Sequence, residues 1–147
     1  MIRNVSRSNA VFAALFAAAA LSTAACSASL PTSASIGAPF SQTDLIAGTG
    51  TAAASGSTLG VNYIGWLFDP SQPSSQGAQF DASTSTFTFT LGSGQVIQGW
   101  EQGLVGLKVG GKRRLIIPPS LAYGDSRHGP IPPNATLIFD ITLLSVQ

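Results

Sequence analysis

Alternating apolar and polar residues mark two segments of the chain as strands. In residues 86–91 (TFTFTL), Phe87, Phe89 and Leu91 fall on one face and threonines on the other, which is the period of a half-buried strand. Residues 136–146 repeat this period, with apolar positions at Leu137, Phe139, Ile141 and Leu143. Each strand therefore has one face suited to a core.

The remaining segments predict a mainly β domain with one helix. Residues 61–68 (VNYIGWLF) and 113–117 (RRLII) are rich in aromatic or branched residues and are predicted as strands, the latter ending at a Pro-Pro pair. A short helix is predicted over 98–104, where glycines mean that only packing against a sheet can hold it. Residues 69–79, rich in Pro, Ser and Gln, are predicted as a surface loop. The fold class is α+β, an antiparallel sheet with one apolar face folded over the helix.

The N-terminal residues have the order of a secretory signal peptide. Arg3 and Arg7 precede an uncharged run over 10–25, made mostly of Ala, Leu, Val and Phe, so residues 1–25 are predicted to direct export and be removed. The run is shorter than the roughly 20 residues that span a bilayer. Cys26 follows at once and is the only cysteine, which leaves no partner for an intramolecular disulfide.

The segment around Cys26 resembles the lipobox of bacterial lipoproteins, although Thr23 stands where Leu is usual. The resemblance implies lipidation of Cys26 and a place on the periplasmic side of a bacterial membrane, at the outer membrane if the host has one. The alternative is an incidental small residue beside an ordinary cleavage site, and a protein that is soluble in the periplasm or secreted. Residues 26–43, rich in Ser, Ala, Thr, Pro and Gly, are predicted as a flexible tether, and the domain is placed at 44–147.

Charge gives no support for nucleic-acid binding. Without Arg3 and Arg7, five basic residues remain beside six acidic ones, a formal charge of −1. Residues 112–114 (KRR) form the only basic cluster, and three such residues on a strand are ordinarily a solvated face. His128 lies in a loop without a second ligand motif, so neither a metal nor another cofactor is expected.

Six short motifs in order resemble the FKBP family of peptidyl-prolyl cis-trans isomerases. They are VNYIGWL at 61–67, FD at 80–81, LGSGQVIQGWEQGL at 91–104, VGGKRR at 109–114, LAYG at 121–124 and IPPNATLIFD at 131–140. Together they span most of residues 58–147 with family spacing apart from the loops. The resemblance implies an antiparallel half-barrel sheet wrapped around one short helix.

The same resemblance implies the residues of a proline-binding pocket. Asp81 and Tyr123 take the catalytic positions, and the substrate-binding positions fall on Tyr63, Phe80, Phe87, Val96, Ile97, Trp100, Ile131 and Phe139. The backbone N–H of Ile97 is expected to be free for a ligand carbonyl. Rotation about an X–Pro bond needs no nucleophile or metal, and a rigid apolar cradle that favours the twisted amide suits the aromatic composition.

Each of these residues also has a structural interpretation. The aromatic side chains could simply fill the core, as we expect for Phe89, and Tyr63 could serve mainly to hold Asp81 by a hydrogen bond. The stretch 83–86 is shorter than in many members and lacks the arginine that often pairs with the aspartate, and Gln95 replaces a common Glu.

The predicted function is an isomerase acting on proline-containing polypeptides, because the pocket aromatics and the aspartate are kept; the alternative is a module that binds such segments without turnover. The resemblance also implies macrolide inhibitors as ligands. Contact with the membrane is expected only through a lipid anchor, and a monomer is expected because the sequence shows neither the helical dimerisation arm nor the inserted flap of some relatives.

Overall fold

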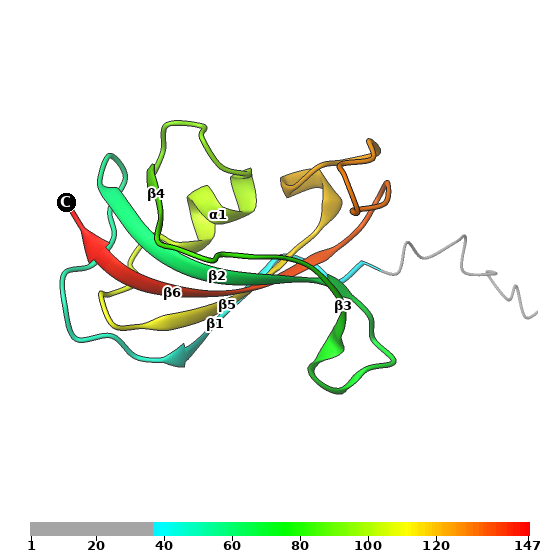
Figure 1. The fold of residues 1–147 in the computed structure, drawn as a ribbon, viewed down its shortest axis with the longest axis horizontal. Helices are drawn as coiled ribbons and strands as arrows, with labels where there is room; N and C mark the ends of the chain where they lie inside the picture. The colour runs from blue at the N-terminus through cyan, green and yellow to red at the C-terminus, as the bar shows by residue number, and fades with distance from the viewer. Residues whose placement is uncertain (1–36) are drawn as a thin grey trace, which may run out of the picture. The chain divides into compact units, whose positions relative to one another are not determined.

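The computed structural model of the protein describes residues 37–147, which form an antiparallel sheet with one short helix (Figure 1). The strands are β1 (Ser41–Ile46), β2 (Thr58–Phe68), β3 (Gln76–Ala82), β4 (Phe87–Thr90), β5 (Lys112–Ile117) and β6 (Leu137–Val146). The helix is α1 (Gln98–Gly103), and two 3-10 turns lie at Pro73–Ser75 and Pro119–Leu121. The predicted α+β half-barrel is confirmed.

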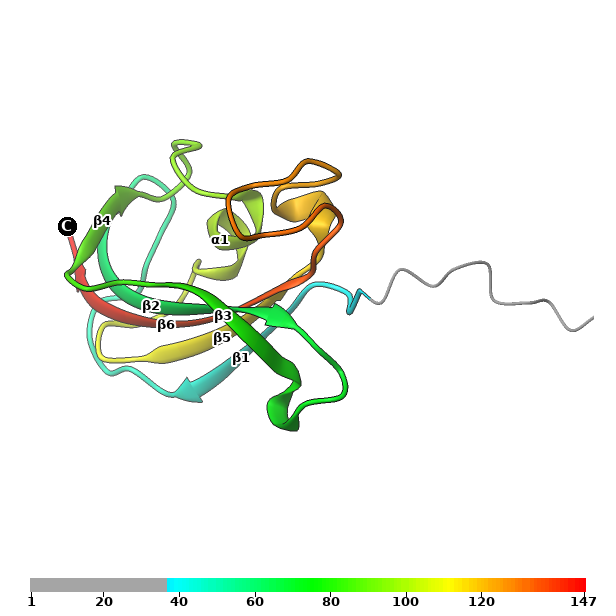
Figure 2. The same cartoon turned by 45° about the vertical axis from the view of Figure 1, so that its right-hand side comes forward.

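Strands β2 and β6 form the centre of the sheet. The order is β1-β5-β6-β2-β3, with β4 paired to β2 beside this path. The sheet curves, and α1, β4 and the segment before β6 lie on the same side of it (Figures 1 and 2). The four apolar positions predicted for β6, Leu137, Phe139, Ile141 and Leu143, are all buried in the core. Burial does not alternate along the strand, however, because Ile138 and Asp140 on the opposite face are buried as well.

Two glycines let α1 lie directly on β5. A Cβ atom on Gly99 would be 2.7 Å from Ile117 Cδ1, and one on Gly103 would be 2.7 Å from Leu115 Cδ2. Any larger residue would push the helix off the sheet. The glycines that weaken this helix in isolation are therefore what allows the packing that holds it, and that packing buries Trp100 on the concave side.

Arg113 joins the helix to the sheet edge. Its Nη1 donates to the carbonyl oxygens of Gly103 (2.9 Å) and Val105 (3.0 Å), and Nη2 donates to Asp44 Oδ2 at 3.1 Å. The side chain is buried, and the neighbouring Arg114 binds Asp140 through two hydrogen bonds. The interpretation of residues 112–114 as a solvated face is thus wrong for Arg113, because the end of α1 offers its carbonyls to the guanidinium.

The folded region begins before Asp44. Strand β1 starts at Ser41, and Phe40 packs against the core, so the predicted tether over 26–43 is wrong for its last residues; residues 26–36, with Cys26, lie outside the described part. The predicted loop over 69–79 is also wrong for 76–79, which begin β3. Both strands lie at the edges of the path and carry few core residues, so neither shows the apolar period of a central strand. Within residues 37–147, no helix has the length and apolar character needed to cross a membrane.

Candidate functional site

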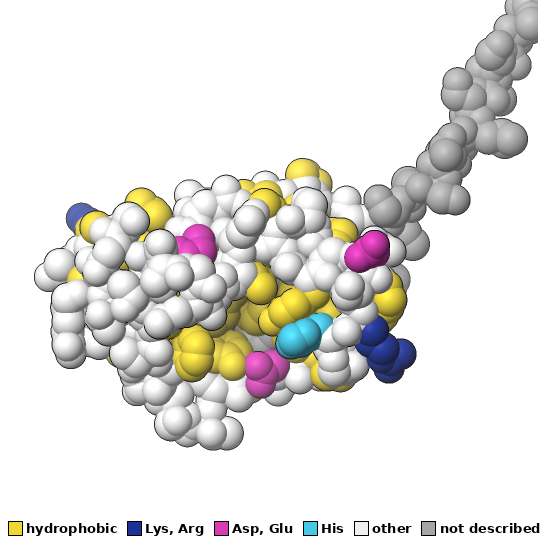
Figure 3. Space-filling view, turned by 90° about the horizontal axis from the view of Figure 1, so that it is seen from above, with side chains coloured by type: hydrophobic (Ala, Val, Ile, Leu, Met, Phe, Trp, Pro, Cys, Tyr) yellow, Lys and Arg dark blue, Asp and Glu magenta, His cyan; other side chains and the backbone are white. Residues whose placement is uncertain are grey.

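A hollow of about 310 Å³ is lined by side chains of β2, β3, β4, β6 and α1, of the loop before α1, and of the loop after the 3-10 turn at Pro119–Leu121. Its lining consists of Tyr63, Phe80, Asp81, Phe87, Gln95, Val96, Ile97, Trp100, Tyr123 and Phe139. Apolar side chains surround it on this face of the molecule (Figure 3). A concave, mainly apolar site with a few polar groups is the usual form of a small-ligand pocket.

Trp100 forms the centre of an aromatic cage. Its ring centroid lies 5.1 Å from that of Tyr63, 5.2 Å from Phe139 and 6.2 Å from Phe87, in each case edge to face. Only 4% of Trp100 is exposed, because α1 places it directly over the sheet. Edge-to-face packing of this kind holds the rings in fixed orientations, so the pocket has rigid walls before any ligand arrives.

The back of the cage depends on Gly65 in β2. A Cβ atom at this position would be 2.7 Å from Phe80 Cζ and 2.8 Å from Phe139 Cε1. The two phenyl rings, whose centroids are 5.5 Å apart, meet across the bare backbone of this glycine. The glycine of the IGW sequence within β2 therefore shapes the pocket, because the absence of a side chain at Gly65 leaves room for both rings.

Tyr63 and Asp81 form the principal polar contact of the pocket. Tyr63 Oη donates to Asp81 Oδ2 at 2.8 Å, and the Ala82 N–H donates to Asp81 Oδ1 at 2.9 Å. Burial and the hydrogen bond to this carboxylate raise the pKa of Tyr63 to about 12. Burial and the charge of Asp81 also raise the pKa of Tyr123. Both phenols therefore remain protonated donors at neutral pH.

The loop before α1 presents a free backbone donor. Ile97 is the N-cap of the helix, and its carbonyl accepts from the N–H groups of Trp100 and Glu101, whereas none of the hydrogen bonds found within residues 37–147 uses the Ile97 N–H. The carboxylate of Glu101 holds this loop by accepting from the Gly92 and Gly94 N–H groups. Gln95 Oε1 accepts from the Thr90 N–H at 2.9 Å.

Nine of the ten side chains assigned to the site from sequence line this one pocket. The exception is Ile131, which is buried in the core instead of lining the hollow. Reciprocal backbone hydrogen bonds with His128 close a turn there. Phe89 also lies outside the lining and is buried, as expected.

Two contacts of the pocket were not predicted. Gln95 lines it, and its place beside Val96 in the same motif was the available signal. The His128 ring stacks on Tyr123, with ring centroids 4.2 Å apart and planes 7° from parallel. In the part of the chain that the structure describes, no group of three or more His, Cys, Asp or Glu side chains is arranged to hold a metal ion.

Comparison with known proteins decides the family. The sequence family described as FKBP-type peptidyl-prolyl cis-trans isomerase matches residues 49–144. The chain belongs to the FKBP family. Its pocket can therefore be compared with the family pattern residue by residue.

Relatives and solved structures agree with this assignment. The chain is 52% identical over 104 residues to FK506-binding protein 4 of Dictyostelium discoideum, and the match covers 69% of this chain and 27% of that protein. It is 40% identical over 106 residues to FK506-binding protein 1 of Aspergillus oryzae, covering 68% and 91% respectively. FkpA from Escherichia coli superposes with a TM-score of 0.63 at 41% identity, covering 74% of this chain and 48% of FkpA. AtFKBP13 superposes with a TM-score of 0.64 at 34% identity, and the match covers 74% of this chain and 93% of AtFKBP13.

Several of these FKBP relatives are much longer than the shared region. The chain spans 27% of the Dictyostelium protein and 44% of FK506-binding protein 2B from Rhizopus delemar. The comparisons therefore identify an FKBP domain and its fold.

Proposed function

We propose that this protein is a peptidyl-prolyl cis-trans isomerase that accelerates rotation about X–Pro bonds in polypeptides. The observation that carries the proposal is the cage around Trp100: Tyr63, Phe87 and Phe139 stand edge-on to its indole, and together they enclose a hollow of about 310 Å³. A proline ring is apolar and compact, so it brings no polar group of its own into the cage that would need a hydrogen-bond partner.

The pocket supports the reaction by favouring the twisted amide over the planar one. Rotation meets a barrier of about 18–20 kcal/mol, because the planar C–N bond is partly double. An apolar wall stabilises the less polar twisted state relative to the planar amide, which water solvates well. The Ile97 N–H and the Tyr123 hydroxyl can donate to the peptide carbonyls and so fix the chain on either side of the rotating bond.

The test is isomerisation of a short X–Pro peptide by the purified protein. We expect rapid turnover, reduced at least about tenfold in Trp100→Leu and in Asp81→Ala while both variants remain folded. Trp66→Leu is the matched control, because Trp66 pairs with Ile138 on β2 and β6 and lies outside the pocket lining. If the folded parent binds proline peptides without accelerating rotation, the protein is a binding module and the enzyme proposal fails.

The names of the relatives suggest a ligand for the same pocket. Proteins named FK506-binding proteins match this chain at 40–52% identity, and nine of the ten residues that the resemblance assigned to the site line the pocket here. We therefore propose that FK506-type macrolides occupy the pocket and compete with proline peptides. Displacement of a bound peptide by FK506, absent in Trp100→Leu, tests this.

Export and lipidation are proposed from the N-terminal sequence. The uncharged run over 10–25 followed by Cys26 supports cleavage before Cys26, lipidation of that residue, and a place on the periplasmic side of a bacterial membrane. Mass spectrometry of the mature protein from a bacterial host tests this: a diacylglyceryl-modified Cys26 is expected, and Cys26→Ala should appear in the soluble fraction. We also propose that the protein is a monomer, which sedimentation of the unlipidated protein tests.

A further inference from the structure

Asp81 is the only charged residue among those that line the pocket. Its two hydrogen bonds come from the Tyr63 hydroxyl and the Ala82 N–H, and both donors are neutral. The residue is exposed at the rim. Neither hydrogen-bond partner is a cation, so the carboxylate faces the part of a bound chain that lies outside the cage without a neutralising partner.

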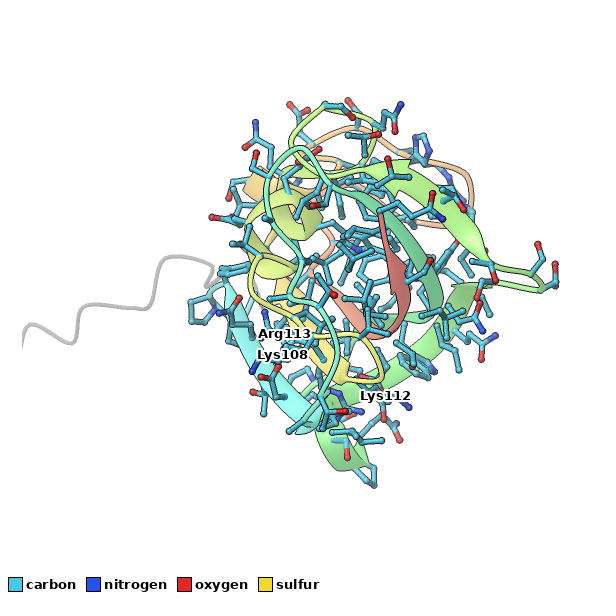
Figure 4. The ribbon with its side chains drawn as sticks, turned by 90° about the vertical axis from the view of Figure 1, so that its left-hand side faces the viewer. Lys108, Lys112 and Arg113 are labelled. Atoms are coloured by element: carbon cyan, nitrogen blue, oxygen red, sulfur yellow. The ribbon has the colours of Figure 1, made fainter. Side chains whose placement is uncertain are left out.

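Lys112, Arg113 and Arg114 are paired with carboxylates other than Asp81. The ion pairs within residues 37–147 join Arg113 to Asp44, and Lys112 and Arg114 to Asp140. None of them includes Asp81. Figure 4 shows Lys108, Lys112 and Arg113 gathered around the start of β5. In the loop between Tyr123 and Ile131 (residues 124–130, the rim loop), Arg127 donates from Nε to the Gly129 carbonyl.

The rim loop adds no net charge that would offset the carboxylate. Asp125 and Arg127 both lie in this loop and cancel formally. The carboxylate of Glu101 accepts hydrogen bonds from the backbone N–H groups of Gly92 and Gly94. The charge of Asp81 reaches Tyr123 across the pocket, since it is one of the causes that raise the pKa of that phenol. The mouth of the pocket therefore carries an uncompensated negative charge.

We infer that Asp81 makes this pocket selective for polypeptides with Lys or Arg next to the proline. The inference rests on the proposed function and deepens it by naming a substrate class. The residues that flank a caged proline must lie at the rim, where a positive side chain is attracted to the carboxylate and a negative one is repelled. For unit charges about 7 Å apart at a rim exposed to water, with an effective dielectric constant of about 40–80, Coulomb attraction corresponds to a preference of roughly three- to sevenfold.

The experiment compares matched peptides that carry Lys, norleucine or Glu beside the proline, with one series varied before it and one after it. Both kcat/KM and the dissociation constant are measured at low and at high salt. We expect the Lys peptide to exceed the Glu peptide by at least about threefold in one series, with norleucine between them, and we expect salt to reduce the difference. Equal values for Lys and Glu in both series would overturn the inference.

Variants assign the preference to the carboxylate. Asp81→Asn removes the charge and keeps the shape of the side chain. The ratio of kcat/KM for the Lys peptide to that for the Glu peptide is measured within this variant and should fall close to one. This ratio does not depend on how the substitution changes the absolute rate. Thr84→Arg, at an exposed position three residues away, should lower the ratio with Asp81 still present. Asp69→Asn removes a charge outside the pocket lining and should leave the ratio unchanged. A ratio that persists in Asp81→Asn would contradict the assignment.

Failure of the inference can be distinguished from failure of the proposed function. If no peptide is isomerised, the enzyme proposal fails, and the ratio of dissociation constants for the Lys and Glu peptides still decides the role of Asp81. If all peptides are isomerised equally well, the enzyme stands and the selectivity does not.

Discussion

The phenol of Tyr63 stands edge-on to the indole of Trp100, with ring centroids 5.1 Å apart and planes at 76°, while its hydroxyl donates to Asp81 at 2.8 Å. One side chain of β2 therefore supplies part of the apolar cage and orients the only carboxylate in it. Tyr63 is both a wall and a holder of Asp81, so the two interpretations of this residue from sequence are compatible.

Replacing Gly65 by Ala should deform the back of the pocket. The new Cβ would meet Phe80 and Phe139 at 2.7–2.8 Å, and overpacking of this kind costs about 1–3 kcal/mol. We expect a lower urea midpoint and at least a severalfold loss of isomerase activity. The double variant Gly65→Ala, Phe80→Leu should recover part of the lost stability, because the smaller side chain makes room. Additive losses in the double variant would show that the clash is elsewhere.

Titration of the tyrosine phenols reports only on pocket residues, because Tyr63 and Tyr123 are the only two tyrosines in the sequence. The pKa of Tyr63 is raised to about 12, and that of Tyr123 is raised as well, in both cases chiefly by burial. Both phenols should therefore resist ionisation at pH 10, where an unfolded tyrosine is half ionised. A raised folded pKa stabilises the fold below the unfolded value, and this contribution is lost as pH rises from about 10 through about 12.

Absorbance near 295 nm follows this titration in the folded protein. The Asp81→Asn variant should show a lower pKa for Tyr63, since the negative partner is gone. A phenolate signal already half developed at pH 10 in the native parent would contradict the burial of both side chains.

Asp44→Asn should destabilise the protein at neutral pH and do so less in acid. The hydrogen bond from Arg113 holds the pKa of Asp44 below its usual range, with burial opposing and the charge of Arg113 adding to the shift. A depressed folded pKa contributes stability above the unfolded value of about 3.9, and this is lost as pH falls through the folded pKa. Because Arg113 is buried while Asp44 is half-exposed, we expect a loss of about 1–3 kcal/mol at pH 7.

Urea unfolding at pH 7 and pH 2.5 measures this difference. The gap between parent and variant should be smaller at the lower pH, because protonation of Asp44 in the parent removes the charge that binds Arg113. Asp125→Asn is the control, because this exposed carboxylate makes no ion pair within the described residues. An equal gap at both pH values would argue against an electrostatic cause.

Glu101→Ala should loosen the loop that presents the Ile97 N–H. The carboxylate accepts hydrogen bonds from Gly92 and Gly94, and bonds to a charged acceptor contribute about 1.5–3 kcal/mol. We expect faster amide exchange at both glycines and a rise in KM for the X–Pro peptide. Glu101→Gln, which retains one acceptor oxygen, should lie between parent and Ala variant. Unchanged exchange in the Ala variant would show that the loop is held by other contacts.

The sequence by itself determined β2, β4, β5 and β6 and the composition of the site. Residues 86–91 and 136–146 alternate because one face of each must meet the core, and that period is visible without any knowledge of partners. The aromatic side chains and Asp81 could be assigned because they stand in motifs with family spacing. The edge strands β1 and β3 were not predicted from the sequence. They join the sheet mainly through backbone hydrogen bonds, which residues with any side chain can form.

Tertiary structure alone decided where the charges and the small residues act. Arg113 is buried because its guanidinium, the carbonyls at the end of α1 and the carboxylate of Asp44 meet at one point, although these groups come from three separate segments. Ile131 turns into the core, and Gly65 creates space for two rings that are 59 residues apart in the chain (Phe80 and Phe139). Such relations depend on distances between elements, which a linear pattern does not contain, whereas the alternation of a strand depends only on its own residues.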